Sequence, residues 1–273
     1  MRQAAKLAIC SPIKNRAWCL PYYLECILAL EYPKTRTALF FADDGSTDGG
    51  AEMLEEWAAR HRSEYAGIDI THVTPIRNNT SSRDAGIYHR DVYRHIGDMR
   101  NLLRGQARVW GANALFTVDS DTLFAPDIVT ALLAHKVPLV SSINYVDCVY
   151  KGSLGCDPPE QRRYINAGYF TPQGEHRAYR EYDLNALLPI QITAGTYLMD
   201  KATLNSAATY EANLTNSEQG EDVGFCLHLE RLGIPRFIDT TVRSVHIMEE
   251  GFLPAAVRAA RRLWHAHFDI CAY

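Results

Sequence analysis

The chain has 273 residues, of which 47% are hydrophobic and 22% are charged, and its formal net charge is -4. This length allows a large buried core, and the weakly acidic balance argues against a broad grip on a nucleic-acid backbone. Arg258, Arg261 and Arg262 are the best candidates for a local basic patch. Seven cysteines without a Cys-x-x-Cys pair indicate a reducing compartment rather than disulfides or a zinc site.

The first residues lack the apolar run of a signal peptide, and no stretch of ~18 uncharged apolar residues follows. We therefore expect a soluble, cytoplasmic protein without an integral membrane segment.

Strand-like and helix-like segments alternate along the first half of the chain. Apolar, strand-like runs occupy residues 6–10, 37–42, 68–74 and 115–118. Helical spacing of apolar residues occupies 20–32, 51–61 and 92–110. This alternation predicts an α/β fold with a mainly parallel, twisted sheet that carries helices on both faces.

The second half is less regular. Strand candidates are residues 138–145, 195–200 and 235–240, and residues 253–269 alternate apolar and basic side chains at helical spacing. That last segment either packs Val257, Leu263, Trp264 and Phe268 on the domain or touches an anionic membrane. Residues 74–91 and 146–180 lack a period and are expected to form long loops.

Carboxylates cluster at three points of this pattern. Asp119 and Asp121 follow the strand-like run that ends at Val118, and residues i and i+2 of an extended chain project to the same face. They form either a site for Mg²⁺ or Mn²⁺ or a solvated acidic turn. Asp43 and Asp44 end another strand, where open α/β sheets bind ligands.

Three acidic motifs follow one another along the chain in an order that is typical of a known enzyme family. "FFADDGSTD", "TVDSD" and "GEDVGF" together resemble the inverting GT-A glycosyltransferases of family 2, over Ile9 to about His246. "LPYYLECILALEYPKTR" is similar to the catalytic domains of procollagen galactosyltransferases. The resemblance implies one GT-A (Rossmann-like) domain over residues 1–273. Residues of about 1–125 would bind the nucleotide sugar, about 126–250 the acceptor, and about 251–273 would form a C-terminal helix.

The resemblance also implies site residues. The nucleotide sugar would be bound by Ser11, Pro12, Asp44, Arg100, Asp119 and Ser120, with Arg104 as the alternative to Arg100. The metal would be bound by Asp121 and Asp119. His246 either completes this metal site or is a structural histidine. Gly195 and Thr196 would border the acceptor, although Gly195 could equally serve a tight strand entry.

The catalytic base is expected at the start of a helix. Asp222 is the first candidate and Glu221 the second, although acidic residues in a first helical turn also complement the helix dipole without any catalytic role. The predicted reaction is metal-dependent transfer of a hexose, with Mn²⁺ or Mg²⁺, from a nucleoside diphosphate sugar, a UDP-sugar above all, to a hydroxyl of a glycan, lipid, protein or small molecule.

Two other functions fit the same motifs less well. A non-catalytic sugar-nucleotide binding protein would bind the donor without turnover. A sugar-1-phosphate nucleotidyltransferase usually has a glycine-rich loop after the first strand, which "CSPIKNRAW" lacks. For a glycosyltransferase, we expect residues 74–91 and 146–180 to be mobile without the donor and to become ordered around it when it binds.

Overall fold

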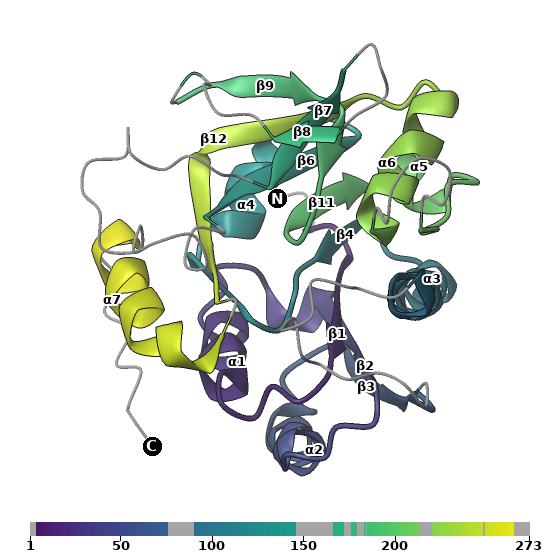
Figure 1. Cartoon of the computed structure of the whole chain (residues 1–273). Coiled ribbons are helices and arrows are strands. Elements are labelled where there is room, and N and C mark those ends of the chain that lie inside the picture. Colours follow the sequence, from purple (N-terminus) through teal and green to yellow (C-terminus); the bar gives the residue numbers. More distant parts are fainter. Residues whose placement is uncertain are drawn as a thin grey trace.

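A computed structural model describes residues 4–75, 90–145, 166–171, 176–178, 183, 185–212, 220–247 and 249–264. Its core is a nine-stranded sheet in the order β3-β2-β1-β4-β11-β6-β12-β5, with β9 beside β12 (Figure 1). The strands of this sheet are β1 (Leu7–Ile13), β2 (Thr37–Asp43), β3 (Gly67–His72), β4 (Ala114–Thr117), β5 (Thr122–Phe124), β6 (Leu139–Tyr145), β9 (Leu187–Ile190), β11 (Tyr197–Asp200) and β12 (Arg236–His246). A smaller sheet contains β10 (Ile192–Thr193), β7 (Ala167–Phe170) and β8 (His176–Ala178).

Strand direction follows the sequence-based expectation. β3, β2, β1 and β4 pair in parallel, and so do β6 and β12. β11 is inserted antiparallel between β4 and β6, so these two groups of strands run in the same direction. Only β5, β9 and β11 run against the other six strands of the large sheet as described. The prediction of an α/β fold with a mainly parallel sheet is confirmed.

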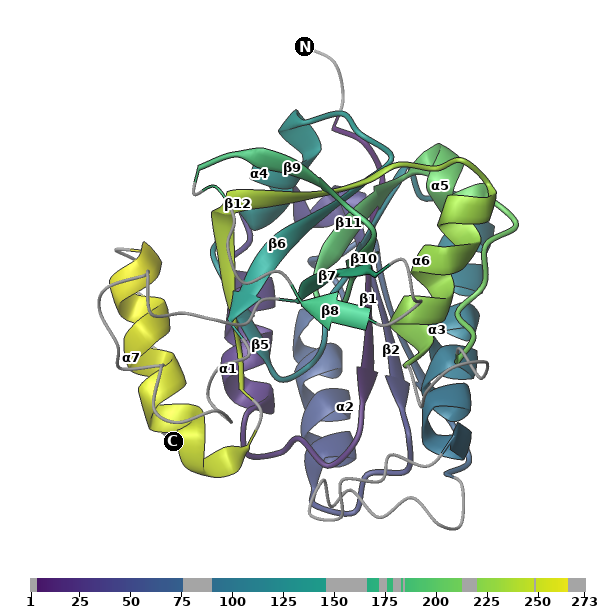
Figure 2. The ribbon, with the colours of Figure 1, turned by 45° about the horizontal axis from the view of Figure 1, so that its top comes forward.

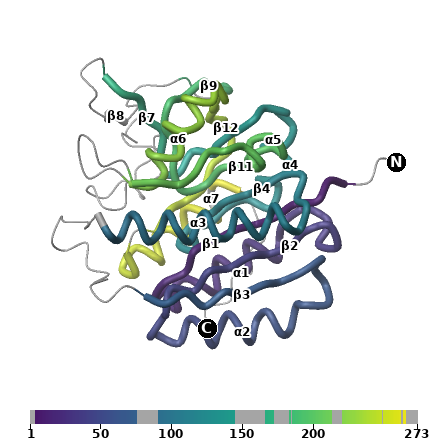
Figure 3. Tube along the Cα trace, turned by 90° about the vertical axis from the view of Figure 1, so that its right-hand side faces the viewer, coloured from purple at the N-terminus to yellow at the C-terminus, as the bar shows by residue number. Residues whose placement is uncertain are grey.

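The helices cover both faces of this sheet. They are α1 (Leu20–Leu28), α2 (Gly50–His61), α3 (Arg90–Trp110), α4 (Ile128–Ala134), α5 (Lys201–Asn205), α6 (Glu221–Arg231) and α7 (Leu253–Trp264), with short 3₁₀ turns at Lys34–Arg36 and Glu250–Phe252. Figure 2 shows α3, α5 and α6 together on one side of the sheet and α1 and α7 on the other. In the side view of Figure 3, α3 runs along the sheet next to α5 and α6.

Alternating side chains of the parallel strands build the two layers of the core. Along β1, Leu7 and Ile9 face the cluster formed with α1, α2, α4 and α7, whereas Ala8 and Cys10 face the cluster formed with α3, α5 and α6. All four are at most 3% exposed. A strand buried on both faces has no solvent-facing positions, and this explains the continuous apolar run from Leu7 to Cys10.

Several elements differ from the sequence-based prediction. β5 and α4 lie between Asp121 and Lys136, where no element was expected, because both are short. The strand expected at residues 235–240 is longer and continues to His246, with a register shift between Asp239 and Arg243. The segments expected to order around a donor, 74–91 and 146–180, fall largely outside the described residues.

The C-terminal helix packs on the domain, which is the first of the two alternatives that the sequence left open. Val257, Leu263 and Trp264 contact the core cluster that includes α1 and α4, whereas Phe268 lies outside the described residues. None of the helices in the described ranges combines the length and apolarity needed to cross a lipid bilayer.

Candidate active site

The carboxyl ends of β1 and β4 bring the first group of predicted site residues together. These strands are parallel neighbours in which Cys10 lies opposite Thr117. The residues that follow each strand are therefore also side by side, and the hydroxyl of Ser120 donates a 3.1 Å hydrogen bond to the carbonyl of Pro12. Ser11 is buried and hydrogen-bonds the hydroxyl of Tyr23.

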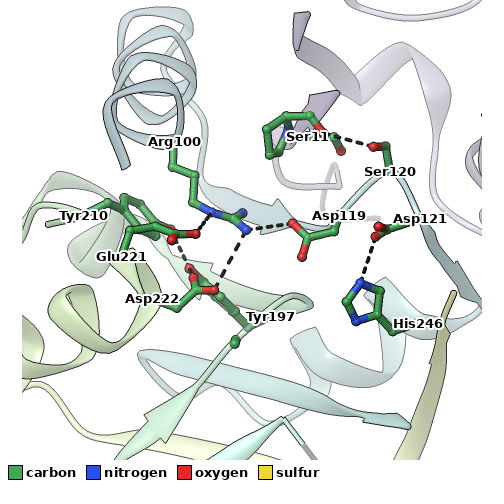
Figure 4. Close-up of polar contacts among 12 residues, drawn as sticks. Ser11, Arg100, Asp119, Ser120, Asp121, Tyr197, Tyr210, Glu221, Asp222 and His246 are labelled. Carbon is green, nitrogen blue, oxygen red and sulfur yellow. Dashed lines mark hydrogen bonds and ion pairs between the residues drawn. The ribbon is translucent and has the colours of Figure 1, made fainter. Parts of the chain in front are cut away.

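The register of β5 and β12 brings His246 to the Asp-Ser-Asp motif. His246 pairs with Thr122, and the next N–H, that of Ile247, donates to the carbonyl of Asp121 at 2.7 Å. The Nε2 atom of His246 consequently lies 3.0 Å from Oδ1 of Asp121 (Figure 4). The ring of His246 thus contacts the motif itself, and its role as a metal ligand stays a prediction.

These residues fit a divalent metal ion. One ligand atom each from Asp119, Asp121 and His246 can be chosen so that all three lie within 4.8 Å of one another. The two carboxylates are hard oxygen donors of the kind that Mn²⁺ and Mg²⁺ accept, and the imidazole adds a nitrogen donor, which suits the transition metal Mn²⁺ better than Mg²⁺. Asp121 is 5% exposed, and its Oδ2 is already engaged by Arg16, whose Nε and Nη2 each lie 3.0 Å away.

Arg100 on α3 links this group to a second cluster of carboxylates. Its Nη2 donates to Oδ1 of Asp119 at 2.7 Å, and its Nε donates to Oε1 of Glu221 at 3.0 Å. Nη2 also lies 3.9 Å from Oδ2 of Asp222. Burial alone would lower the pKa of Arg100, but the three carboxylates outweigh it and hold that pKa well above its usual value.

Arg104, the alternative to Arg100 as a nucleotide-binding arginine, contacts backbone carbonyls and not these carboxylates. It lies one turn further along α3, and its guanidinium donates to the carbonyls of Thr203, Ser206 and Ala208. Burial lowers its pKa to about 10. Arg104 therefore ties α3 to the end of α5, and Arg100 is the arginine at the carboxylates.

Asp222 and Glu221 begin α6 beside Arg100. Burial raises the pKa of Asp222 to about 7, the nearby Arg100 opposes this, and the charges of Glu221 and Asp119 add to it. Burial also raises the pKa of Glu221, again against Arg100. Tyr197 on β11 reaches Asp222 with its hydroxyl at 3.5 Å. Figure 4 shows the acidic side chains extending from Glu221 and Asp222 past Asp119 to Asp121. A carboxyl group with a pKa near neutrality is suited to accept a proton.

Gly195 and Thr196 also lie at this cluster. β11 runs antiparallel to β4 with Tyr197 opposite Thr117, so the residues before Tyr197 meet those after Thr117. Gly195 has a φ of +79°, in the left-handed region that favours glycine. A Cβ at Gly195 would lie 3.5 Å from Oδ2 of Asp119 and only 2.5 Å from Nδ2 of Asn144. Thr196 is fully buried.

Asp44 lies at the end of β2 in a polar environment that the sequence did not reveal. Its two oxygens contact Nζ of Lys14 at 2.8 Å and Nε2 of His95 at 2.6 Å. Asp44 is 1% exposed. Lys14, Arg16 and His95 are polar residues of this site that the sequence analysis missed. The only available signal was that Lys14 and Arg16 follow the first strand, whose carboxyl end faces the ligand edge of such sheets.

The sequence matches one protein-family model over most of its length. The model is that of glycosyltransferase family 25, N-terminal domain, and it covers residues 5–223. The matching model is thus that of glycosyltransferase family 25, whereas the three acidic motifs, in their order along the chain, resemble the glycosyltransferases of family 2.

Two curated relatives show what this similarity includes. Procollagen galactosyltransferase 2 of Mus musculus is 22% identical over 188 residues, which are 68% of this chain and 29% of the relative. Inactive glycosyltransferase 25 family member 3 of Homo sapiens is 26% identical over 171 residues, which are 62% of this chain and 26% of the relative. The resemblance to procollagen galactosyltransferases is confirmed, and the chain spans less than a third of the length of either relative.

Solved structures support the fold. The mannosyltransferase PcManGT from Pyrobaculum calidifontis, in complex with GDP-Man and Mn²⁺, superposes with a TM-score of 0.55 at 16% identity, over 90% of this chain and 57% of that one. GalNAc-T7 with UDP, GalNAc and Mn²⁺ superposes with a TM-score of 0.57 at 12% identity, over 90% of this chain and 44% of that one. The predicted GT-A fold is confirmed.

Proposed function

The chain belongs to glycosyltransferase family 25, and we propose that it transfers a hexose from a nucleoside diphosphate sugar to an acceptor hydroxyl, with a divalent metal ion and with inversion at the sugar carbon. The observation that carries this proposal is the arrangement of two linked groups. Asp119, Asp121 and His246 form a potential metal site, and Arg100 joins that site to Asp222, a carboxyl group whose pKa is raised.

Asp119, Asp121 and His246 would hold the metal. A bound Mn²⁺ or Mg²⁺ supplies positive charge to the diphosphate as the bond to the sugar breaks. The position of Asp119 and Asp121, just after β4, fits this role because the carboxyl ends of parallel strands form the ligand edge of the sheet. His246 is the last residue of β12.

Asp222 is the proposed base, with Glu221 as the second candidate. The acceptor oxygen would form the new bond to the sugar carbon while its proton passes to a carboxylate oxygen of Asp222, and the nucleoside diphosphate leaves with the electron pair. A hydroxyl is a weak nucleophile until its proton is removed, so the base matters in the transition state. Glu221 is engaged by the Nε of Arg100 at 3.0 Å and is therefore the less available of the two.

The donor pocket is proposed at the ends of β1 and β2. Ser11, Pro12 and Asp44 would contact the nucleotide, with Ser120 beside Pro12, and Gly195 and Thr196 would border the acceptor. We assign UDP as the nucleotide, and GalNAc-T7 is a neighbour of the same fold that binds UDP with Mn²⁺. The division into a donor half of about residues 1–125 and an acceptor half of about 126–250 is part of this proposal.

A non-catalytic role in binding nucleotide sugars is the second candidate. It is favoured by one observation, namely that a relative of comparable similarity is named an inactive member of the same family. The two functions share the donor site and differ only in turnover.

Thermal-shift measurements with UDP and UDP-hexoses, with Mn²⁺ or with EDTA, test the donor site, because ligands that bind the native state raise its melting temperature. We expect UDP to stabilise the protein much more in Mn²⁺ than in EDTA, and Asp121→Ala to remove that difference. Equal stabilisation in both would contradict the metal site. Release of UDP from UDP-galactose or UDP-glucose then separates the enzyme from the binding protein, in which metal-dependent binding would occur without donor consumption.

A further inference from the structure

Arg16 lies in the turn between β1 and α1 and contacts Asp121, one residue of the potential metal site. Its Nε and Nη2 atoms each lie 3.0 Å from Oδ2 of Asp121, while His246 faces the other oxygen, Oδ1. Asp121 is therefore held between a guanidinium and an imidazole. Asp121, an expected metal ligand, is thus already paired with the positive charge of Arg16.

The backbone of this turn is fixed independently of that contact. Asn15 adopts a left-handed conformation with a φ of 49°, its N–H donates to Oγ of Ser46 at 3.0 Å, and its Oδ1 accepts from the N–H of Thr47 at 2.8 Å. The carbonyl of Arg16 accepts from the N–H of Leu20 at 2.7 Å. The Arg16 side chain is 27% exposed, and its Nη1 also donates to the carbonyls of Lys14 and Asn15 at 3.1 and 3.3 Å, so these two contacts would rearrange when the guanidinium leaves Asp121.

Charge explains why Arg16 occupies this place. Asp121 is 5% exposed, and a buried carboxylate without a positive partner is strongly unfavourable. A divalent ion bound by Asp119, Asp121 and His246 would compensate the same carboxylate. Two cations on one carboxylate repel each other, so the guanidinium and the ion compete for Asp121.

We propose that Arg16 is the exchangeable counter-cation of Asp121, which it neutralises before the metal binds and leaves for the donor diphosphate afterwards. This inference rests on the proposed function. The turn that carries Arg16 follows β1, the strand of Ser11 and Pro12, so the chain that would contact the nucleotide also brings the guanidinium to the metal ligand Asp121. A planar guanidinium also matches two phosphate oxygens at once.

The proposal predicts opposite changes in two affinities. Arg16→Gln removes the competitor, so Mn²⁺ alone should bind about tenfold more tightly. The same variant lacks the cation for the diphosphate, so UDP in saturating Mn²⁺ should bind about tenfold more weakly. A residue that only supports the structure would weaken both. Free Mn²⁺ measured by electron paramagnetic resonance and UDP binding measured by calorimetry give the two values.

Two further variants complete the experiment. Arg16→Lys keeps the charge and should leave the Mn²⁺ affinity near that of the wild type. Arg60→Gln removes an exposed arginine of α2 whose Nε donates to the carbonyl of Glu56 in the same helix, and should change neither affinity. If Arg16→Gln is unfolded without metal, circular dichroism should show that Mn²⁺ restores its structure, because the ion replaces the missing cation. Failure of Mn²⁺ to restore it would overturn the proposal.

The outcomes separate this inference from the proposed function. Wild-type protein that binds Mn²⁺ and UDP, together with an Arg16→Gln variant whose two affinities fall in parallel or stay unchanged, overturns the role of Arg16 alone. Absence of Mn²⁺ and UDP binding in both proteins overturns the inference and the proposed function together.

Discussion

The Nη2 atom of Arg100 lies 3.9 Å from Oδ2 of Asp222. The same nitrogen donates to Asp119, so one guanidinium nitrogen faces both the proposed base and a proposed metal ligand. The proposed base and the proposed metal site thus share an electrostatic partner. A change in the charge of Asp119 or of Asp222 would therefore alter the electrostatic environment of the other through Arg100.

The first prediction concerns pH. Burial raises the pKa of Asp222 to about 7, so the base is protonated and inactive below that pH and becomes available above it. Transfer should therefore rise with pH through neutrality. Arg100→Met removes the positive charge that opposes the shift, so the pKa should rise further and the rising limb should move to higher pH. Initial rates of donor consumption between about pH 5.5 and 9 would measure this shift.

Arg108→Met is the control for that experiment. Arg108 lies on the same helix, and its guanidinium donates to the carbonyls of Leu204 and Ser206. Its loss should leave the position of the limb unchanged. If the rising limb of the pH–rate profile also keeps its position in Arg100→Met, Asp222 is not the group whose titration limits transfer.

The second prediction separates binding from chemistry. Asp222→Asn keeps the size of the side chain but cannot take the acceptor proton. It should lower transfer by roughly 10²-fold or more and leave metal-dependent UDP binding nearly unchanged. Asp121→Asn should weaken donor binding and turnover together. Calorimetry and donor consumption on both variants give the comparison, and normal turnover in Asp222→Asn would move the search for the base to Glu221.

The third prediction tests the space around Gly195. Gly195→Ala would bring a Cβ to 2.5 Å from Nδ2 of Asn144, in addition to the strain of a φ of +79°. Gly49→Ala is a matched control, because Gly49 has a φ of +86° and open space around its Cβ position. Both should lose about 1 kcal/mol of stability from backbone strain, but only Gly195→Ala should also lower donor turnover. Equal turnover in the two variants would mean that the close approach at Gly195 has no bearing on the site.

The fourth prediction concerns how α6 is held. A Cβ at Gly224 would overlap the carbonyl oxygen of Glu211, so the helix that carries Asp222 packs directly against backbone. Gly224→Ala should therefore lower the free energy of unfolding by about 3 kcal/mol or more. Gly105→Ala, in α3 with nothing within 4 Å of the new Cβ, should raise it by about 0.5–1 kcal/mol. Urea unfolding monitored by circular dichroism measures both, and similar values would contradict the close packing.

The parts of the fold that the sequence predicted are those with strong local signals. The continuous apolar runs of β1 and β2 and the long amphipathic α3 could be read directly. β5 could not, because its three residues carry no period, and without β5 the register that brings His246 to Asp121 was not visible. The contact of His246 with Asp121 therefore could not be predicted from the sequence.

Side-chain direction was the other missing information. Arg100 and Arg104 lie one turn apart on one helix, and the sequence pattern treats them alike. The structure separates them because Arg100 faces the ends of β4 and α6, whereas Arg104 faces the carbonyls after α5. Lys14 and Arg16 were missed for a related reason. Basic residues in a turn are normally solvated, and only the parallel pairing of β1 with β2 and with β4 reveals that Lys14 contacts Asp44 and Arg16 contacts Asp121.

The position of β12 has a practical consequence for the design of expression fragments. This strand pairs with β6, β5 and β9, so it is an interior strand of the sheet although it comes late in the chain. A fragment that stops after α6 would leave the backbone groups of β6 without their partner and would turn that strand into an open edge. Unpaired edges of this kind recruit other chains and promote aggregation. Soluble, folded fragments should therefore extend through α7, which covers β12 and β5.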